Sequence, residues 1–195
     1  MAKNLNYYKN QSTKIEGKKI ILNIMGKRHI SRCIRWLADP EVNKFLTNNI
    51  KNVTRQQELE WLNFIKSSQT DIVFAINDKK SGTYIGNCGL HKVDICRKTC
   101  EFGIFIGDRK YWKKGFGTDA VKTILNFTSA ELGLENVRLT VYEYNHRAIN
   151  VYKRCGFCTV GILNKHHFYN DLYWDAYIMQ HDFGKAGRGN KKTAI

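Results

Sequence analysis

The chain has 195 residues, of which 43% are hydrophobic, so it can bury one domain core and is too short for two domains of usual size. Lys and Arg number 32 against 17 Asp and Glu, which leaves a formal net charge of +15. This excess favours an anionic partner and disfavours a polycationic one, because the surface repels cations. No apolar run approaches the roughly 20 residues of a membrane helix and the start has no signal-peptide core, so we expect a cytoplasmic protein that does not enter membranes.

Apolar periodicity divides the chain into a central domain and two basic ends. Residues 1–17 are predicted to be a mobile or loosely docked arm, residues 18–183 a single α/β domain of mixed α+β type, and residues 184–195 a flexible tail. The patterns predict, in chain order, a strand at 19–25, helices at 30–37, 40–46 and from 54 onward, strands at 72–76, 84–93 and 100–107, a helix at 118–132, a strand at 137–141, a helix at 145–156, and strands at 159–163 and 172–179. This order predicts a mixed, mostly antiparallel twisted sheet of about seven strands with helices on both faces.

The six cysteines are not needed for a disulfide framework, because the chain can bury its own core and has no export signal. Cys96 with Cys100, and Cys155 with Cys158, have spacings from which a four-thiolate zinc site can be built. The second pair straddles a predicted helix-to-strand turn. We therefore favour free buried thiols and expect no metal.

Residues 106–120 carry the strongest functional signal. A strand ends there, a basic loop follows, Gly115 and Gly117 flank Phe116, and a helix begins. Glycines let a ligand approach the main chain closely, and the first amides of a helix attract anions. The segment therefore predicts a phosphate or pyrophosphate site, with Lys113 and Lys114 adding charge at its rim.

Other interpretations of this loop compete. It is not a Walker loop, because no Gly-Lys-Ser/Thr closes it. Gly115 to Ala120 matches the Gly-x-Gly-x-x-Ala dinucleotide pattern, but about eight residues separate it from the preceding strand, and Glu135 precedes the next strand instead of ending it. A tight turn with solvated lysines is the purely structural alternative.

Four motifs in order resemble the GNAT superfamily of acyl-CoA N-acyltransferases, over residues 19–180. Trp112-Lys-Lys-Gly115-Phe-Gly117 fills the frame Gln/Arg-x-x-Gly-x-Gly/Ala of that family's pyrophosphate loop, with Trp in first place. That departure resembles the branch of ribosomal-protein N-terminal acetyltransferases. The other three motifs of this branch are matched by Trp36-Leu-Ala-Asp39-Pro40-Glu41-Val42, Glu101-Phe-Gly-Ile, and Asn145-His-Arg-Ala148-Ile149-Asn-Val-Tyr152-Lys-Arg-Cys-Gly156-Phe157.

The resemblance implies a single GNAT-like domain that uses acetyl-CoA as co-substrate. In this family the strands corresponding to 100–107 and 137–142 splay apart, and the pantetheine arm lies between them. The implied cofactor-binding residues are Phe105, Ile106, Lys113, Lys114, Gly115, Phe116, Gly117, Thr118 and Asn145. Phe105 and Ile106 would contribute backbone contacts, and the Asn145 side chain would hydrogen-bond the arm.

Acylation of an amine needs a proton acceptor for the amine, donors for the developing oxyanion and a proton for the thiolate. Glu101 is the candidate base, directly or through water, because it stands where the family often places its carboxylate and Phe102 and Phe105 could raise its pKa. The alternative is a strand-edge carboxylate paired with Lys or Arg. Tyr152 is the candidate acid, the alternative being an aromatic packed on the sheet. An amide near Phe105 would be the oxyanion donor, and His91 could line the acceptor pocket.

The net charge favours an amine carried on an anion. A small molecule such as a nucleotide-linked amino sugar is the preferred acceptor, and the N-terminus of a ribosomal protein is the alternative. A basic nucleic-acid-binding module and a CoA sensor without catalysis are the non-enzymatic alternatives, although no nucleic-acid-reading motif is recognisable. We expect a monomer or homodimer.

Overall fold

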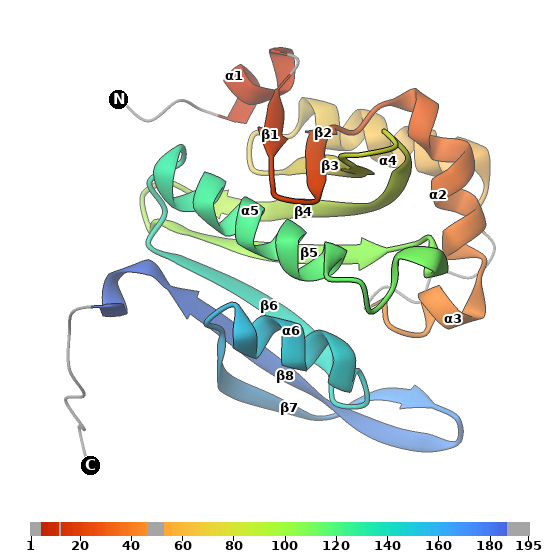
Figure 1. The fold of residues 1–195 in the computed structure, drawn as a ribbon. Helices are drawn as coiled ribbons and strands as arrows, with labels where there is room; N and C mark the ends of the chain where they lie inside the picture. Colours follow the sequence, from red (N-terminus) through yellow and green to blue (C-terminus); the bar gives the residue numbers. More distant parts are fainter. Residues whose placement is uncertain (1–4, 12, 47–52, 187–195) are drawn as a thin grey trace.

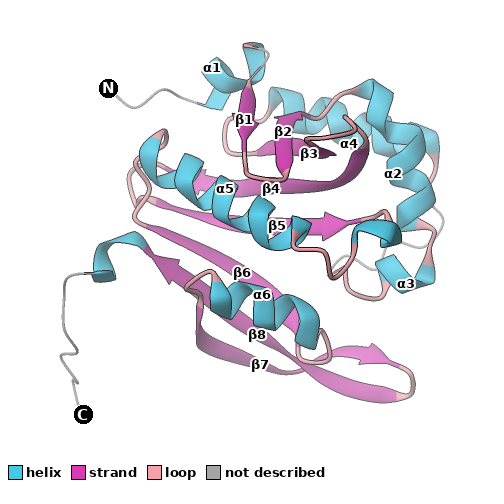
Figure 2. Cartoon of the chain, in the orientation of Figure 1, coloured by secondary structure: helices cyan, strands magenta, loops and turns pink. Residues whose placement is uncertain are grey.

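A computed structural model describes residues 5–11, 13–46 and 53–186, which build a twisted sheet with helices on both faces (Figures 1 and 2). The strands are β1 (Lys14–Glu16), β2 (Ile20–Ile24), β3 (Ile72–Asp78), β4 (Tyr84–Asp94), β5 (Thr99–Ile106), β6 (Asn136–Tyr142), β7 (Cys158–Tyr169) and β8 (Leu172–Asp182). The helices are α1 (Leu5–Asn10), α2 (Ile30–Leu37), α3 (Pro40–Asn43), α4 (Arg55–Ser67), α5 (Phe116–Ala130) and α6 (His146–Arg154), with short 3-10 turns at Lys27–His29, Arg109–Tyr111 and Phe183–Ala186.

The sheet has the order β1-β2-β3-β4-β5-β6-β8-β7. All neighbouring pairs are antiparallel except β5 and β6, which are parallel because α5 crosses between them. The predicted mixed and mostly antiparallel topology is confirmed. The sheet has 8 strands instead of about seven, because Lys14–Glu16 pairs with β2 in a segment where the sequence predicted no strand.

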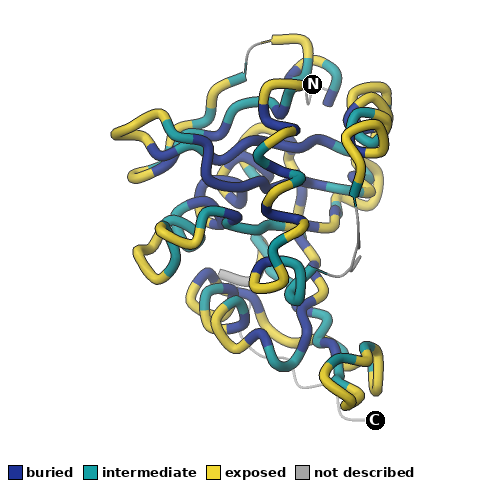
Figure 3. Tube along the Cα trace, turned by 90° about the vertical axis from the view of Figure 1, so that its right-hand side faces the viewer, coloured by how far each residue is buried: buried dark blue, intermediate teal, exposed yellow. Residues whose placement is uncertain are grey.

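Alternation along β3 shows how the two faces are covered. Phe74 is fully buried in a core cluster with α5, whereas its neighbour Val73 belongs to a second cluster with α2 and α4. Successive side chains of a strand point to opposite faces, so α5 and the α2–α4 pair lie on opposite sides of the sheet. The buried part of the trace follows the central strands, and the exposed part includes turns and the outer sides of helices (Figure 3). The edge strand β7 is also largely exposed.

Local sequence signals fix several helix boundaries. The Thr54 side chain accepts from the Gln57 amide and the Gln57 side chain from the Thr54 amide, which confirms the capping box before α4. Asn145 caps α6 as predicted, accepting from the Ala148 amide at 3.2 Å. The helix begun by Pro40 ends at Asn43 instead of residue 46.

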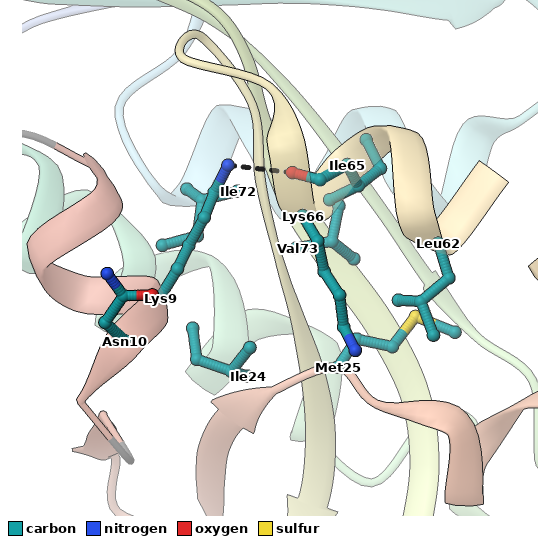
Figure 4. Close-up of a pocket in the computed structure, with 9 residues that line it drawn as sticks. All are labelled: Lys9, Asn10, Ile24, Met25, Leu62, Ile65, Lys66, Ile72 and Val73. Carbon is teal, nitrogen blue, oxygen red and sulfur yellow. Dashed lines mark hydrogen bonds between the residues drawn. The ribbon is translucent and has the colours of Figure 1, made fainter. Parts of the chain in front are cut away.

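The expectation of a loose arm over residues 1–17 is wrong for the part that the structure describes. Leu5 and Tyr8 of α1 are buried in the main core, and the Tyr8 ring meets Phe127 of α5 edge-on at 5.0 Å. Lys9 Nζ donates to the Ile65 carbonyl at 2.7 Å across a small cavity of about 350 Å³ beside α4 (Figure 4). Residues 187–195 of the predicted tail lie outside the described residues.

The six cysteines are free thiols. Cys33, Cys88, Cys100 and Cys155 are buried as predicted, whereas Cys96 and Cys158 are exposed, which corrects the expectation for these two. Among the residues with described positions, no three His, Cys, Asp or Glu side chains gather as a metal ion requires. Within the same residues, no helix has the length and apolar character to cross a bilayer.

Candidate active site

The parallel strands β5 and β6 separate after only three paired positions. Their register runs from Thr99 opposite Asn136 to Glu101 opposite Arg138 and ends there. β5 continues to Ile106 and β6 to Tyr142 without pairing with each other, so the edge of β5 that faces β6 is left for another partner. The predicted splay of these strands is therefore present in the fold.

A cleft of about 1480 Å³ opens at this split. On one side it is lined by the start of α5 and by α6, through residues such as Thr118 and Val151. On the other side it is lined by α2 and α4, through residues such as Cys33 and Trp61. Because these helices cover opposite faces of the sheet, the cleft passes through the sheet and can be approached from both faces.

The glycine loop forms the rim on the α5 side. Gly115 is the residue before α5 and has φ +85, a left-handed conformation that favours glycine. A Cβ placed on Gly117 would meet only Ile106 Cγ1, at 3.9 Å, so space lies open over the first turn. The first amides of α5 have no partner within the helix and carry the positive end of its dipole. Backbone, space and charge therefore fit a diphosphate at this position.

Trp112 replaces the Gln or Arg of the general loop pattern and holds the loop against the sheet. Its Nε1 donates to the Ile106 carbonyl at 2.7 Å, at the end of β5. The guanidinium of Arg147, in the first turn of α6, stacks on the Trp112 ring at 3.9 Å from its centroid. The tryptophan therefore joins the two elements that flank the cofactor side of the cleft.

Lys19 supplies positive charge at the loop that the sequence reasoning missed. Its Nζ donates to the Lys114 carbonyl at 2.8 Å and lies 5.7 Å from the centre of the Phe116 ring. The Asp119 carboxylate, in the first turn of α5, accepts from the backbone amides of residues 18–20 and so fixes Lys19 beside the loop. No local signal could have found this lysine, because it lies 95 residues before its partner.

The structure brings nearly all the predicted site residues to this cleft. Those that line it are Glu101, Phe105, Ile106, Lys113, Gly115, Phe116, Gly117, Thr118, Asn145 and Tyr152. Lys114 does not line it, since its carbonyl binds Lys19 and its side chain is exposed. Lys113 is also exposed and has φ +59 at the rim.

Tyr152 is packed as its structural alternative predicted and also lines the cleft, so its role as the acid stays a prediction. It is 7% exposed, packs at 5.7 Å from the Phe157 ring, and lines the cleft. Burial raises the pKa of its phenol above the ordinary value, with a smaller contribution from Cys155. A phenol in this state stays protonated at neutral pH and can donate a proton.

Glu101 lines the cleft but is already engaged. Its carboxylate forms an ion pair with Lys92 Nζ at 2.8 Å, and its side chain is 52% exposed. Phe102 points to the opposite face of the sheet, into the α5 core, so it does not screen the carboxylate as predicted. The geometry matches the predicted alternative of a strand carboxylate paired with a lysine.

The acceptor side contains polar groups that the sequence reasoning did not combine. His91 Nδ1 lies 2.9 Å from Asp71 Oδ1, and both residues line the cleft. Deeper in, Glu58 accepts from the Cys33 thiol at 3.3 Å, and burial raises the pKa of this carboxyl above its ordinary value. The partners in each pair lie about twenty or more residues apart.

The cleft passes through the sheet where two parallel strands separate, and the N-terminus of α5 at one rim fits a phosphate. A protein with such a cleft can bring two substrates together from opposite faces. Residues 19–158 match the family model described as "Acetyltransferase (GNAT) domain". The chain therefore belongs to the GNAT acetyltransferase family and is an N-acetyltransferase that uses acetyl-CoA. Membership of this family favours an enzyme over the nucleic-acid-binding module and the CoA sensor without catalysis.

Individual relatives show how far the similarity extends. Uncharacterized N-acetyltransferase p20 from Bacillus licheniformis is 25% identical over 148 residues, which are 75% of this chain and 82% of that protein. Mouse alpha/beta-tubulin-N-acetyltransferase 9 is 23% identical over 166 residues, covering 80% of this chain and 68% of that one. The crystal structure of spermidine N-acetyltransferase from Vibrio cholerae with CoA and spermine has a TM-score of 0.77 at 20% identity, covering 83% and 94% of the two chains.

Proposed function

We propose that this chain transfers an acetyl group from acetyl-CoA directly to a primary amine held on the α2–α4 side of the sheet. The observation that carries the proposal is the cleft through the sheet where β5 and β6 separate, since it gives the two substrates opposite entrances and a shared middle. No covalent enzyme intermediate is needed, so the cysteines have no required role in the transfer.

Acetyl-CoA supplies the thioester when it is bound, and the chain's own residues hold it and move protons. The α5 amides at Phe116, Gly117 and Thr118 would hold the diphosphate. The unpaired backbone of β5 near Phe105 would bind the arm and donate to the developing oxyanion. The Asn145 oxygen is used by the α6 cap, so its amide nitrogen is the group that would meet the arm. Tyr152 Oη would protonate the departing sulfur.

The acceptor that we propose is a small amine carried on an anion, such as a nucleotide-linked amino sugar. Aromatic side chains line the acceptor side, among them Trp61 and Phe64, which can stack on a base. The carboxylates there are engaged: Asp71 by His91, Glu58 by Cys33 and Glu101 by Lys92. A free polyamine would have to displace these partners against a net charge of +15.

A polyamine is the second candidate, because the V. cholerae neighbour was crystallised with spermine. A protein N-terminus, the third candidate, has a parallel in the tubulin-N-acetyltransferase relative. The three acceptors differ in charge and size, so one assay separates them.

The test measures release of free thiol from acetyl-CoA with a nucleotide-linked amino sugar, spermidine and a peptide with a free N-terminus. The first amine should give the largest kcat/KM. Acetyl-CoA alone should raise the melting temperature, because it binds the folded state. A melting temperature that does not respond to acetyl-CoA would count against the cofactor site, and a preference for spermidine would overturn the proposed acceptor only.

A further inference from the structure

On the acceptor side, two neighbouring glycines leave part of the sheet surface without side chains. Gly89 of β4 stands opposite Gly103 of β5 in the antiparallel register, so both present the same face. A Cβ on Gly103 would meet no atom within 4 Å, which leaves open space over the β5 backbone. Phe105, two residues along β5, lies on the same face and packs toward α2 and α4.

The His91 ring lies over the other half of this patch. A Cβ on Gly89 would come within 2.8 Å of His91 Nε2, so only glycine allows the ring to fold back over the sheet there. The opposite ring nitrogen, Nδ1, contacts Asp71 Oδ1 at 2.9 Å. The imidazole is therefore held at one nitrogen and has its other nitrogen beside the open space.

The hydrogen bonds around Asp71 keep its carboxylate ionised. Burial alone would raise the pKa of this carboxyl, but hydrogen bonds from Ser68, His91 and Thr70 outweigh burial and lower it. The side chain is 14% exposed, against 34% for His91. An ionised carboxylate only accepts, so His91 donates from Nδ1, and in the neutral ring Nε2 is the nitrogen with a free lone pair.

We propose that His91 Nε2, and not Glu101, receives the proton of the acceptor amine, with Asp71 as its positioning residue. This inference rests on the proposed acetyl transfer. Glu101 stands opposite His91 in the register but is paired with Lys92 and half exposed. His91 needs no change of partner before it accepts a proton.

The protons balance in this scheme. An acceptor ammonium gives one proton to His91, which passes it to solvent, and the freed nitrogen lone pair forms the new N–C bond as the C–S bond breaks. Sulfur leaves with the electron pair of that bond and takes a proton from Tyr152. The second proton lost by the acylated nitrogen replaces the one that Tyr152 gave.

One charged group contacts the ring directly. The charged and titratable groups on the neighbouring elements are Lys9 on α1, Asp71 before β3, Lys92 on β4, Glu101 on β5 and Arg138 on β6. Among these described groups, Asp71 is the one that forms a hydrogen bond with the imidazole. Without that bond the ring would be free to turn, and Nε2 would lose its fixed position while the substrate sites stay in place.

The decisive variant is His91→Asn, whose amide keeps a donor near the Nδ1 position and has no Nε2. We expect kcat/KM for the amine to fall roughly 100-fold, the usual contribution of a positioned base, with the acetyl-CoA-induced rise in melting temperature retained. Glu101→Gln should change kcat/KM less than about fivefold, the size of an exposed ion pair. His181→Asn, on β8 and outside the cleft lining, is the matched control.

Asp71→Asn tests the positioning role through the tautomer of the ring. In the neutral wild-type ring, nitrogen NMR should find the proton on Nδ1, and the variant should lose this preference. Its kcat should fall roughly tenfold while KM for the amine stays within about twofold, because the proton acceptor is no longer held in position. A wild-type rate for His91→Asn, or an unchanged tautomer in Asp71→Asn, would overturn the inference. A wild-type enzyme that releases no thiol with any amine would instead sink the proposed function, and the NMR measurement would still test the pair.

Discussion

The two sides of the cleft are built in different ways. The proposed diphosphate site is one short stretch of chain, residues 112–118, where backbone amides, two glycines and the start of α5 would hold the ligand. The acceptor side is assembled from side chains on separate elements, with Cys33, Glu58, Asp71 and His91 among its polar members. The first kind of site depends on local conformation, and the second depends on the whole fold.

This difference bears on substrate choice. A backbone site changes only when the loop conformation changes, so it can serve the same cofactor across very different sequences. A side-chain site can be rebuilt by single substitutions while the sheet beneath it stays the same. The contrast is consistent with relatives whose names share acetyl transfer and differ in the acceptor. Variants that disable one side and spare the other sharpen the comparison.

The largest effect is expected from Gly117→Arg on the cofactor side. The added side chain meets little protein, so the chain should fold, but it would fill the space over the first turn of α5. At an acetyl-CoA concentration 100 times the wild-type Kd, the stabilisation of about 2.7 kcal/mol should disappear in a thermal shift. Gly26→Arg, also in open space and outside the cleft lining, should keep it. Equal shifts in the two variants would place the diphosphate elsewhere.

Tyr152→Phe should act on turnover and spare binding. Loss of the phenol removes the proposed proton donor, and kcat should fall roughly 100-fold with an unchanged acetyl-CoA thermal shift. The burial that raises the Tyr152 pKa keeps this donor protonated, so wild-type kcat should not decline through neutral pH because of it. Tyr173→Phe, at a residue that is 64% exposed on β8, is the control. A kcat equal to that of the control would remove Tyr152 from the mechanism.

Trp112→Phe and Trp174→Phe form a matched pair. Each indole donates to a backbone carbonyl, Trp112 to Ile106 at 2.7 Å and Trp174 to Tyr169 at 3.0 Å. Each variant should lose about 1 kcal/mol of unfolding free energy. Only Trp112→Phe should also raise KM for acetyl-CoA, by roughly tenfold, because that bond and the Arg147 stack hold the loop. If both tryptophans affect KM equally, the loop is not what Trp112 holds.

The same contrast explains what the sequence could predict. The alternation of β5, the capping box of α4 and the glycine loop are local patterns, and each is where it was expected. α1 is too short for a periodic signal, and burial of Leu5 and Tyr8 becomes visible only in the packed core. Lys19 at the loop and Asp71 beside His91 depend on strand pairing and helix docking, which no local window contains.

The smallest effect concerns the buried carboxyl on the acceptor side and is read from stability. Burial raises the pKa of Glu58 above its ordinary value of 4.5, although its bond with the Cys33 thiol acts in the opposite direction. An acid whose pKa is higher in the folded state stabilises the fold below the unfolded pKa and loses that contribution as pH rises through the folded pKa.

Glu58→Gln keeps the shape and removes this titration. The unfolding free energy of the variant should therefore rise relative to that of the wild type as pH rises from 4 to 8. Glu60→Gln, on the exposed side of the same helix, should show no such trend. The comparison is made by urea unfolding at several pH values. A Glu58→Gln chain that loses stability at pH 8 would mean that partners on the acceptor side hold the charged carboxylate, which would contradict a pKa raised by burial.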